Sequence, residues 1–219
     1  MSTPDLPAPG STERTRVRRI PEKAVADRSV LHAVLDAGLV AHVAVVDDGQ
    51  PYVVPVAYAR DGERVLFHGS TGSRLFRALA DGAHTCFTVT LLDGLVLARS
   101  AFESSMHYRG AMALGTCTVL EGDDKARALR VISDHLLPGR WDDIREPSKK
   151  ELAATLMLAL PLDEVSVKIS ASDPADDPQD VDRPVWGGVV PIREVFGEPL
   201  PDERGAAYAV PEYVKGWTR

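Results

Sequence analysis

The stretch AHVAVVDDGQPYVVPVAYARDGERVLFHG, residues 41–69, consists of three apolar runs joined by two short turns. The runs are rich in Val, Tyr and Phe. Both turns, at residues 47–50 and 61–63, contain the Asp-Gly pair that is typical of tight hairpins. Connections this short join antiparallel neighbours, because parallel strands need a crossover of a dozen or more residues. The stretch therefore predicts an antiparallel β-sheet.

The rest of the chain continues this pattern and inserts helices into it. Further strand-like runs, with a turn expected at Asp93-Gly94, occupy residues 83–92, 95–99, 110–122 and 164–170. Apolar residues at helical spacing predict helices within residues 24–40 (ending in a left-handed cap at Gly38), 73–80, 123–137 and 148–160. About six antiparallel strands with inserted helices favour a mainly β fold, a small closed or partly open barrel, because closure removes exposed strand edges.

Composition limits the partners and the compartment. The chain has 219 residues, a formal net charge of −7 and a pI near 5.4. Affinity for nucleic acid rests largely on Lys and Arg neutralising phosphates, so we expect no nucleic-acid partner. The start is polar and proline-rich, and no stretch approaches the roughly 20 apolar residues that span a bilayer. We therefore expect a cytoplasmic protein without membrane contact.

The same survey divides the chain into three parts. Residues 1–19 are expected to form a flexible tail and residues 20–170 the barrel domain. Residues 171–219 begin with an acidic, proline-containing stretch and continue with an apolar run that contains Trp186. We expect this extended C-terminal segment to pack on the barrel or on a partner subunit.

The segment FHGSTGSRLFRAL, residues 67–79, reads as the end of a strand, a turn of small residues and the start of a helix. The first N–H groups of a helix have no intrahelical partners, and here Ser70, Thr71 and Ser73 add hydroxyls and Arg74 adds a guanidinium. This composition suits a phosphate group. The alternative is an ordinary cap by Ser70 or Ser73 with Arg74 in solvent, and both interpretations stand at this point.

Two other places attract attention. Pro55 cannot donate a ladder hydrogen bond, so an edge, a bulge or an exposed face is expected there, with backbone groups free for a ligand. The segment ESSMHYRG, residues 103–110, forms either a polar wall around a heterocyclic ligand or a turn whose tyrosine plugs the barrel end. His68 and His107 flank these candidate sites, in a chemical role or a packing one. The six histidines lack metal-ligand spacing, so no metal site is expected.

Taken in order, these segments resemble the pyridoxamine 5'-phosphate oxidase-like, FMN-binding split β-barrel proteins. They are most similar to the flavin-nucleotide-binding branch related to nitroimidazole resistance proteins. The resemblance runs from about Arg19 to Pro191 and is carried by residues 41–60, 67–79, 86–110, 136–152, 163–170 and 185–192. It implies a six-stranded antiparallel split β-barrel with inserted helices. It also implies a homodimer that binds two FMN molecules in the grooves between its subunits.

The resemblance assigns roles to particular residues. It implies that the backbone of Pro55, Val56, Ala57 and Tyr58 lines the flavin ring, that Ser70, Ser73 and Arg74 bind the FMN phosphate, that Arg109 reaches the ribityl or phosphate region, and that Trp186 packs near the flavin from the partner subunit. His68 is a candidate for tuning the flavin.

The sequence departs from the pyridoxamine oxidases in two ways. They have Ser-Arg-Lys where this chain has Ser73-Arg74-Leu75, so one phosphate-binding cation is missing. Their substrate-binding tail of Arg and His character is also not reproduced, so pyridoxamine oxidation is not expected. We expect an FMN-dependent oxidoreductase that passes reducing equivalents from NAD(P)H to a small acceptor. Alternatives are a flavin carrier or sensor without turnover, a haem protein with His68 or His107 as axial ligand, and a barrel without cofactor.

Overall fold

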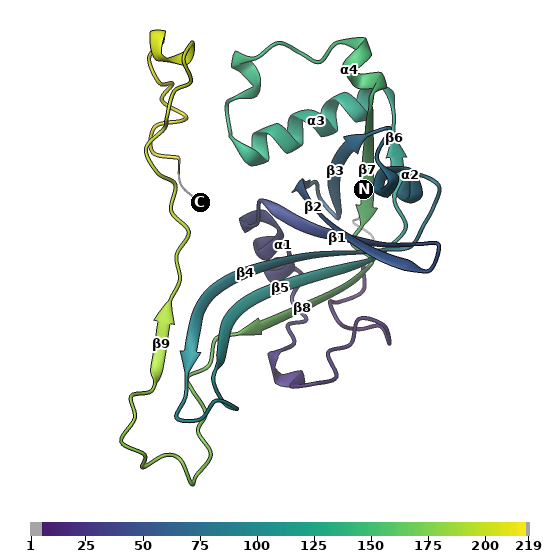
Figure 1. Cartoon of the computed structure of the whole chain (residues 1–219). Coiled ribbons are helices and arrows are strands. Elements are labelled where there is room, and N and C mark those ends of the chain that lie inside the picture. The colour runs from purple at the N-terminus through teal and green to yellow at the C-terminus, as the bar shows by residue number, and fades with distance from the viewer. Residues whose placement is uncertain (1–5, 218–219) are drawn as a thin grey trace.

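The computed structural model describes residues 6–217, which form one antiparallel sheet curled into a half-barrel with a few helices around it (Figure 1). The strands are β1 (Val40–Asp47), β2 (Gln50–Arg60), β3 (Arg64–Ser70), β4 (Thr85–Leu97), β5 (Ser105–Gly115), β6 (Thr118–Leu120), β7 (Thr155–Pro161), β8 (Glu164–Ser170) and β9 (Gly188–Pro191). The helices are α1 (Arg28–Ala37), α2 (Arg74–Ala80), α3 (Gly122–Leu136) and α4 (Lys149–Ala153), with short 3₁₀ turns at η1 (Pro21–Lys23), η2 (Trp141–Asp143) and η3 (Gly205–Ala207). The expected mainly β, antiparallel fold is confirmed.

Strand β2 is shared between the two halves of the sheet. The strand order is β6-β7-β3-β2-β1-β4-β5-β8, and β9 pairs with the outer part of β4. Residues 50–57 of β2 pair with β1 only, whereas β3 pairs with Tyr58, Ala59 and Arg60. The first eight residues of β2 therefore present one unpaired edge. This is the edge expected at Pro55, which itself pairs in register with His42 of β1.

Helix α1 fills the inner face of the sheet. Its N-cap, Asp27, accepts a hydrogen bond from the Ser29 backbone N–H at 2.7 Å. Leu31, Val34 and Leu35 are each only 1% exposed and belong to the core that the inward-facing side chains of the strands complete. Burial of such apolar surface is the main source of stability in a fold of this kind.

Gly38, which follows α1, has an extended backbone (φ −83°, ψ 147°) and not the expected left-handed one. Glycine is required here by a close approach. A Cβ atom at this position would lie 2.6 Å from the Tyr58 hydroxyl oxygen and 2.6 Å from Cγ1 of Val89. That hydroxyl is buried and donates a 2.6 Å hydrogen bond to the carbonyl of Leu35, so the end of α1 is fixed to β2.

Helix α3 covers the other face of the sheet, where Ala128 and Ile132 pack with Ala59, Leu66 and Met157. The sequence predicts one helix over residues 148–160, and this prediction is wrong beyond residue 153. Helix α4 ends there, and the apolar run that follows forms β7 between β3 and β6. The run is buried on both faces, so it lacks the alternation that would have marked it as a strand.

The turn expected at Asp93-Gly94 is also wrong, because β4 continues through it as a β-bulge against β5. The register shifts between Leu92 and Gly94, so Asp93 has no partner residue on β5 in the strand ladder. Gly94 admits β9 on the other side of β4, since a Cβ atom there would lie 3.0 Å from the carbonyl oxygen of Val190.

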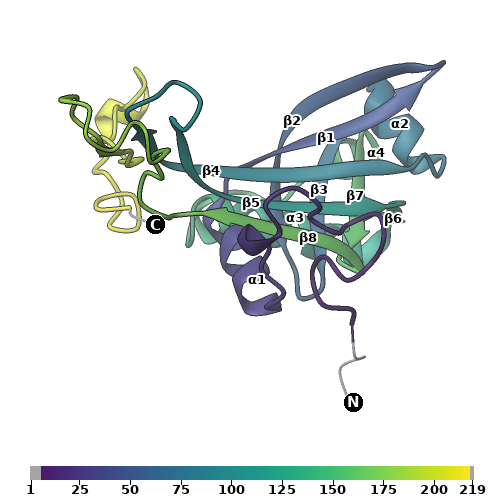
Figure 2. The same ribbon diagram turned by 90° about the horizontal axis from the view of Figure 1, so that it is seen from below.

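The N-terminal end of the described chain lies along the sheet, and the C-terminal end leaves it after β9. The Gly10 backbone N–H donates to the Val165 carbonyl at 2.7 Å and that of Val25 to the Val167 carbonyl at 3.1 Å, so residues 10–25 follow the outer edge of β8. Residues 1–5 of the expected tail lie outside the described residues. After β9, residues 192–217, which we call the C-terminal strap, run past α1 toward the end of α3 (Figures 1 and 2). No helix in residues 6–217 is long and apolar enough to cross a membrane.

Candidate functional site

The turn between β3 and α2 is held by its own backbone. The Ser73 N–H donates to the Ser70 carbonyl at 2.9 Å, and the Thr71 N–H donates to the carbonyl of Ala154 at 3.0 Å. The Ser70 hydroxyl accepts from the Gly72 N–H at 3.1 Å. Ser73 occupies the N-cap position of α2, but its side chain makes no capping hydrogen bond. Of the ordinary serine cap considered for this turn, the N-cap position of Ser73 is present and the side-chain hydrogen bond is not.

Helix α2 is seated by packing just below this turn. Leu75, Phe76 and Leu79 are buried, and a Cβ atom at Gly69 would lie 2.2 Å from the Phe76 ring, so only glycine lets β3 pass over that ring. Leu75, which stands where the pyridoxamine oxidases have a second cation, is 5% exposed and part of the core. This position contributes packing and no positive charge.

Arg74 connects the turn to β2. Its Nη1 donates a 2.9 Å hydrogen bond to the Tyr52 hydroxyl, and its guanidinium carbon lies 4.0 Å from the centre of the Tyr52 ring. Its Nε lies 3.8 Å from the Asp47 carboxylate at the end of β1. Arg74 remains exposed, and helix α2, which it begins, lies beside the hairpin of β1 and β2 (Figure 2). The structure thus brings the candidate phosphate turn and the β2 hairpin together.

The unpaired edge of β2 supplies the second part of this site. Pro55 is exposed, Ala57 is half-buried and Val56 is 9% exposed, and all three lie on the edge of β2 that β3 leaves without ladder partners. The side chain of Tyr58, in contrast, is fully buried in the core. Its backbone pairs in register with Phe67 of β3, so Tyr58 lies just beyond the open edge of β2.

Arg109 and Trp186 lie at the opposite end of β4 from the turn. Ala44 pairs with Cys86 and Arg109 with Leu91, so Asp47 and Arg109 are about eight residues apart along the sheet, roughly 25 Å. A single chain does not bring Arg109 to the turn. Trp186, which is 66% exposed, precedes β9 at that far end.

Arg109 is paired with the bulge residue Asp93. Its Nε and Nη2 donate to the two carboxylate oxygens at 2.9 and 2.7 Å. This bidentate contact holds the pKa of Asp93 below its ordinary range and raises that of Arg109. The sequence could not reveal the pair, because residue 93 was interpreted as part of a turn.

His68 faces a different pocket, of about 380 Å³, between β3, α3 and the segment from η2 to β7. The wall includes Trp141 and the ion pair of Arg145 with Glu151 at 2.6 Å. Desolvation by the surrounding side chains lowers the pKa of His68 below its ordinary 6.5, so the ring is neutral at pH 7. His107 is elsewhere, with Nε2 2.7 Å from the carbonyl oxygen of Ser172.

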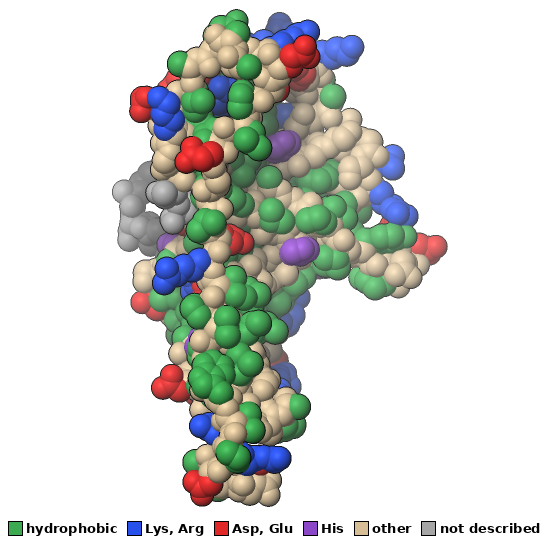
Figure 3. Space-filling model, turned by 60° about the vertical axis from the view of Figure 1, so that its left-hand side comes forward, with side chains coloured by type: hydrophobic (Ala, Val, Ile, Leu, Met, Phe, Trp, Pro, Cys, Tyr) green, Lys and Arg blue, Asp and Glu red, His purple; other side chains and the backbone are tan. Residues whose placement is uncertain are grey.

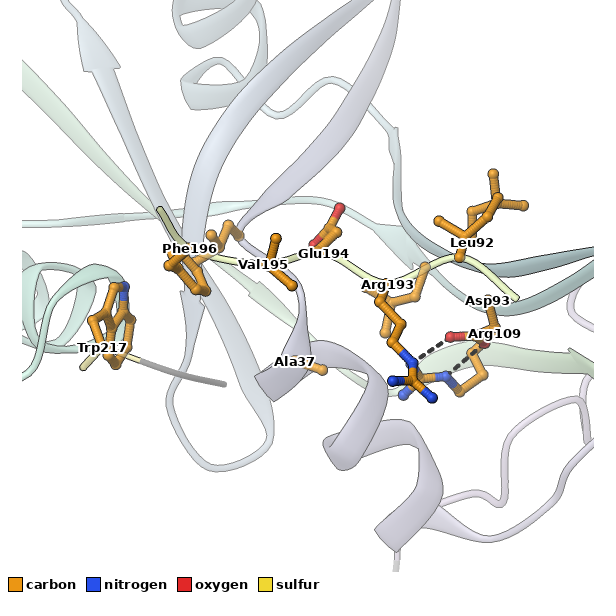
Figure 4. Close-up of a pocket in the computed structure, with 12 residues that line it drawn as sticks. Ala37, Leu92, Asp93, Arg109, Arg193, Glu194, Val195, Phe196 and Trp217 are labelled. Atoms are coloured by element: carbon orange, nitrogen blue, oxygen red, sulfur yellow. Dashed lines mark hydrogen bonds and ion pairs between the residues drawn. The ribbon is translucent and has the colours of Figure 1, made fainter. Parts of the chain in front are cut away.

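A larger pocket, of about 670 Å³, lies between the C-terminal strap and the sheet (Figure 4). Arg109 and Asp93 line it from the sheet, together with Arg193, Phe196 and Trp217 from the strap. Sequence reasoning missed the strap residues, because nothing local indicates that residues 193–196 and Trp217 line one pocket with the bulge of β4. Within the described part of the chain, no cluster of three His, Cys, Asp or Glu side chains could hold a metal ion.

Comparison with known proteins agrees with this geometry. The family model described as pyridoxamine 5'-phosphate oxidase matches residues 27–169, which contain the turn and strands β1–β8 up to residue 169. The chain belongs to the pyridoxamine 5'-phosphate oxidase family. The resemblance inferred from the sequence is thereby confirmed. No curated protein matches the chain.

Solved structures of this family place the chain further. It is 42% identical to the FAD and haem binding protein from Mycobacterium smegmatis, with a TM-score of 0.85 over 89% of this chain and 96% of that one. It is 39% identical to the flavocytochrome Anf3 from Azotobacter vinelandii, with a TM-score of 0.90 over 97% and 99%. A proposed 5-nitroimidazole antibiotic resistance protein from Bacteroides thetaiotaomicron shares the fold (22% identity, TM-score 0.56, 67% and 86% coverage).

Proposed function

We propose that this member of the pyridoxamine 5'-phosphate oxidase family binds a flavin along the unpaired edge of β2, with the flavin phosphate at residues 70–74. The observation that carries the proposal is the contact between Arg74 and Tyr52, which joins a hydroxyl-rich turn to an open strand edge. The Ser73 hydroxyl, which makes no capping hydrogen bond, and the exposed Arg74 guanidinium can donate hydrogen bonds to a phosphate. Backbone groups on the open edge of β2 can form hydrogen bonds with the polar edge of a heterocycle. The solved relatives that are named for FAD and for a flavocytochrome support it.

The bound group is proposed to be FMN, or the FMN half of FAD, since both present the same ring and first phosphate. Position 75 holds a buried leucine, so of the first two residues of α2 only Arg74 can place a positive charge at the flavin phosphate. The flavin would supply hydride and electron transfer, and the protein would bind and orient it. We propose NAD(P)H as electron donor and a small molecule as acceptor, in a cytoplasmic enzyme.

A homodimer is part of this proposal. Exposed apolar side chains line the hairpin of β1 and β2, with Val46 62% and Val53 61% exposed, and further ones occupy the far ends of β4 and β5. Monomeric proteins rarely leave such surface uncovered. A second copy that covers it would also bring its own Arg109 and Trp186 toward the flavin, which one chain alone does not do.

A second candidate function is haem binding at the pocket of His68. A neutral imidazole is the ordinary axial ligand of haem iron, and the pKa of His68 keeps its ring neutral at pH 7. Trp141 offers a flat apolar wall and Arg145 a cation for a propionate. One of the similar solved proteins is described as a FAD and haem binding protein and the other as a flavocytochrome, which supports this candidate. Haem and flavin would then occupy separate sites.

The absorbance spectrum of the purified protein tests both functions. Flavin bands that survive desalting after addition of FMN or FAD would support the first, and reduction of the bound flavin by NADH or NADPH would distinguish an oxidoreductase from a carrier or sensor. A Soret band that is lost in a His68→Ala variant, with flavin bands retained, would support the haem site. A protein that retains neither chromophore would overturn the proposal.

A further inference from the structure

The pocket beneath the C-terminal strap is separate from the proposed flavin turn. It opens between the end of α1, the bulge of β4 with β5, and residues 192–196 with Trp217. Its volume of about 670 Å³ is within the range of small-molecule sites, roughly 300–1,000 Å³. The strap is fixed at both ends. The Ile192 N–H donates to the Asp93 carbonyl at 2.9 Å, and Arg140 donates to the Tyr213 hydroxyl at 3.2 Å.

One end of this pocket carries two guanidinium groups. Arg109 is held by Asp93 through Nε and Nη2, which leaves Nη1 available as a donor. Arg193 also lines the pocket, and it makes no ion pair or side-chain hydrogen bond with any residue between 6 and 217. Two carboxylates, Asp93 on Arg109 and Glu194 next to Arg193 in the strap, balance the two formal charges, so the donors left for a ligand are the Arg193 guanidinium and Nη1 of Arg109. Figure 4 shows the two guanidinium groups toward the end of the pocket away from the aromatic rings.

The other end is aromatic. The rings of Phe196 and Trp217 lie 5.5 Å apart at an angle of 47°. Figure 4 shows both of them at the end of the pocket opposite Arg193 and Arg109. The lining also includes the apolar residues Leu39, Leu91 and Ile192. Hydrophobic side chains are abundant along this whole face of the molecule (Figure 3).

From this arrangement we infer that the pocket binds an adenosine diphosphate group, with its phosphates at Arg193 and Arg109 and its base against Phe196 and Trp217. Guanidinium groups are favoured donors for phosphate, and every nucleobase offers a flat face for aromatic stacking. Two sources carry such a group. One is a free adenine nucleotide, including the adenine half of NAD(P)H. The other rests on the proposed flavin site and homodimer: an FAD whose flavin and first phosphate are bound at residues 70–74 of a partner subunit would leave its adenosine and second phosphate for this pocket.

The test is a titration of the full-length protein with 5'-ADP, followed by calorimetry, in three forms: without flavin, loaded with FMN and loaded with FAD. Binding to all three forms assigns the pocket to a free nucleotide. Binding that is lost only in the FAD-loaded form assigns it to the adenine half of FAD. Absence of 5'-ADP binding in every form would overturn the inference. Because flavin retention is read separately from absorbance, this failure is distinct from failure of the flavin proposal.

Two variants locate the binding. Arg193→Ala should weaken 5'-ADP binding at least tenfold, whereas Arg204→Ala, an exposed strap arginine that does not line the pocket, should leave it unchanged. Phe196→Ala should weaken 5'-ADP more than it weakens inorganic pyrophosphate, which has no base to stack. Equal effects of Arg193→Ala and Arg204→Ala, or equal affinity for pyrophosphate and 5'-ADP, would contradict the site as described.

Discussion

The guanidinium of Arg74 stacks on the ring of Tyr52 at 4.0 Å and donates a 2.9 Å hydrogen bond to its hydroxyl. The two residues are 22 positions apart, on α2 and β2. Their contact places a cation between the turn at residues 70–73 and the open edge of β2. Tyr52 therefore orients Arg74 before any ligand arrives, which reduces the conformational entropy that a phosphate contact costs.

Replacement of Arg74 tests this arrangement directly. Arg74→Ala should weaken flavin binding by about 1.5–3 kcal/mol, on the order of 10- to 100-fold, because a charge-assisted phosphate contact is lost. The measurement is quenching of flavin fluorescence during titration. Arg77→Ala is the matched control, since Arg77 is exposed in the last turn of the same helix. Equal losses in the two variants would show that general charge, and not this contact, attracts the flavin.

The proposed homodimer predicts the effect of a charge on the exposed hairpin. Val53→Asp should convert the dimer to monomer, because burial of an unpaired carboxylate opposes association. Sedimentation velocity measures the change, and the circular dichroism spectrum should show that the fold is kept. A dimer that persists with unchanged affinity would mean that the hairpin is not part of the interface.

Gly38 predicts a local effect on stability. Gly38→Ala should lower the free energy of unfolding by about 1–3 kcal/mol, because the new Cβ atom would overlap the Tyr58 hydroxyl and the Val89 side chain. Urea denaturation measures the change. Gly197→Ala, where nothing lies within 4 Å of the added atom, should change stability little. If the two variants were equally stable, the close packing of β2 on α1 would be refuted.

His68 contributes a pH dependence with a definite sign. Desolvation lowers its pKa in the folded state, so the unfolded state binds the proton first as the pH falls below about 6.5. Well above pH 6.5 the ring is neutral in both states, so His68 does not lower the free energy of unfolding. Between pH 6.5 and the lower folded-state pKa, the unfolded state binds the proton more readily than the folded state, and the free energy of unfolding decreases as the pH falls. The free energy of unfolding should therefore fall less between pH 7.5 and 5.5 in His68→Gln than in the wild type. A larger fall in the variant would reverse the assigned direction.

The two cysteines should react slowly in the folded protein. Burial raises the pKa of the Cys117 thiol to about 12 and also raises that of Cys86, so little thiolate exists at pH 8. Modification of Cys117 by a thiol-specific disulfide reagent should be on the order of 1,000-fold slower than in urea, because the thiolate is the nucleophile. Mass spectrometry after timed quenching follows each site. Rapid native labelling of Cys117 would contradict its burial.

Much of the site could be predicted from local sequence. Asp-Gly turns predicted the antiparallel order of β1, β2 and β3, and Pro55 indicated the open edge of β2. The turn at residues 70–74 was found from its hydroxyls and Arg74. Each of these signals depends on backbone chemistry within a few residues, such as turn geometry, a missing N–H or the unpaired groups at the start of a helix.

The errors share one cause, which is pairing between distant segments. Residues 155–160 were predicted as helix because their burial on both faces removes the alternation of a strand, and only the neighbouring β3 and β6 make them one. Asp93-Gly94 has the composition of a turn, yet β5 and β9 hold it in an extended bulge.

The sequence by itself determined the antiparallel sheet, the open edge at Pro55 and the composition of the turn at Arg74, because these follow from neighbouring residues. Only the tertiary structure decided that Tyr58 points into the core, that Asp93 pairs with Arg109 and that Arg193 reaches the same pocket. Arg109 and Asp93 are 16 positions apart in the sequence, and Arg193 and Asp93, which line the same pocket, are 100 positions apart. These relationships exist because strand pairing and burial of apolar surface bring distant segments together, and no local pattern records that proximity.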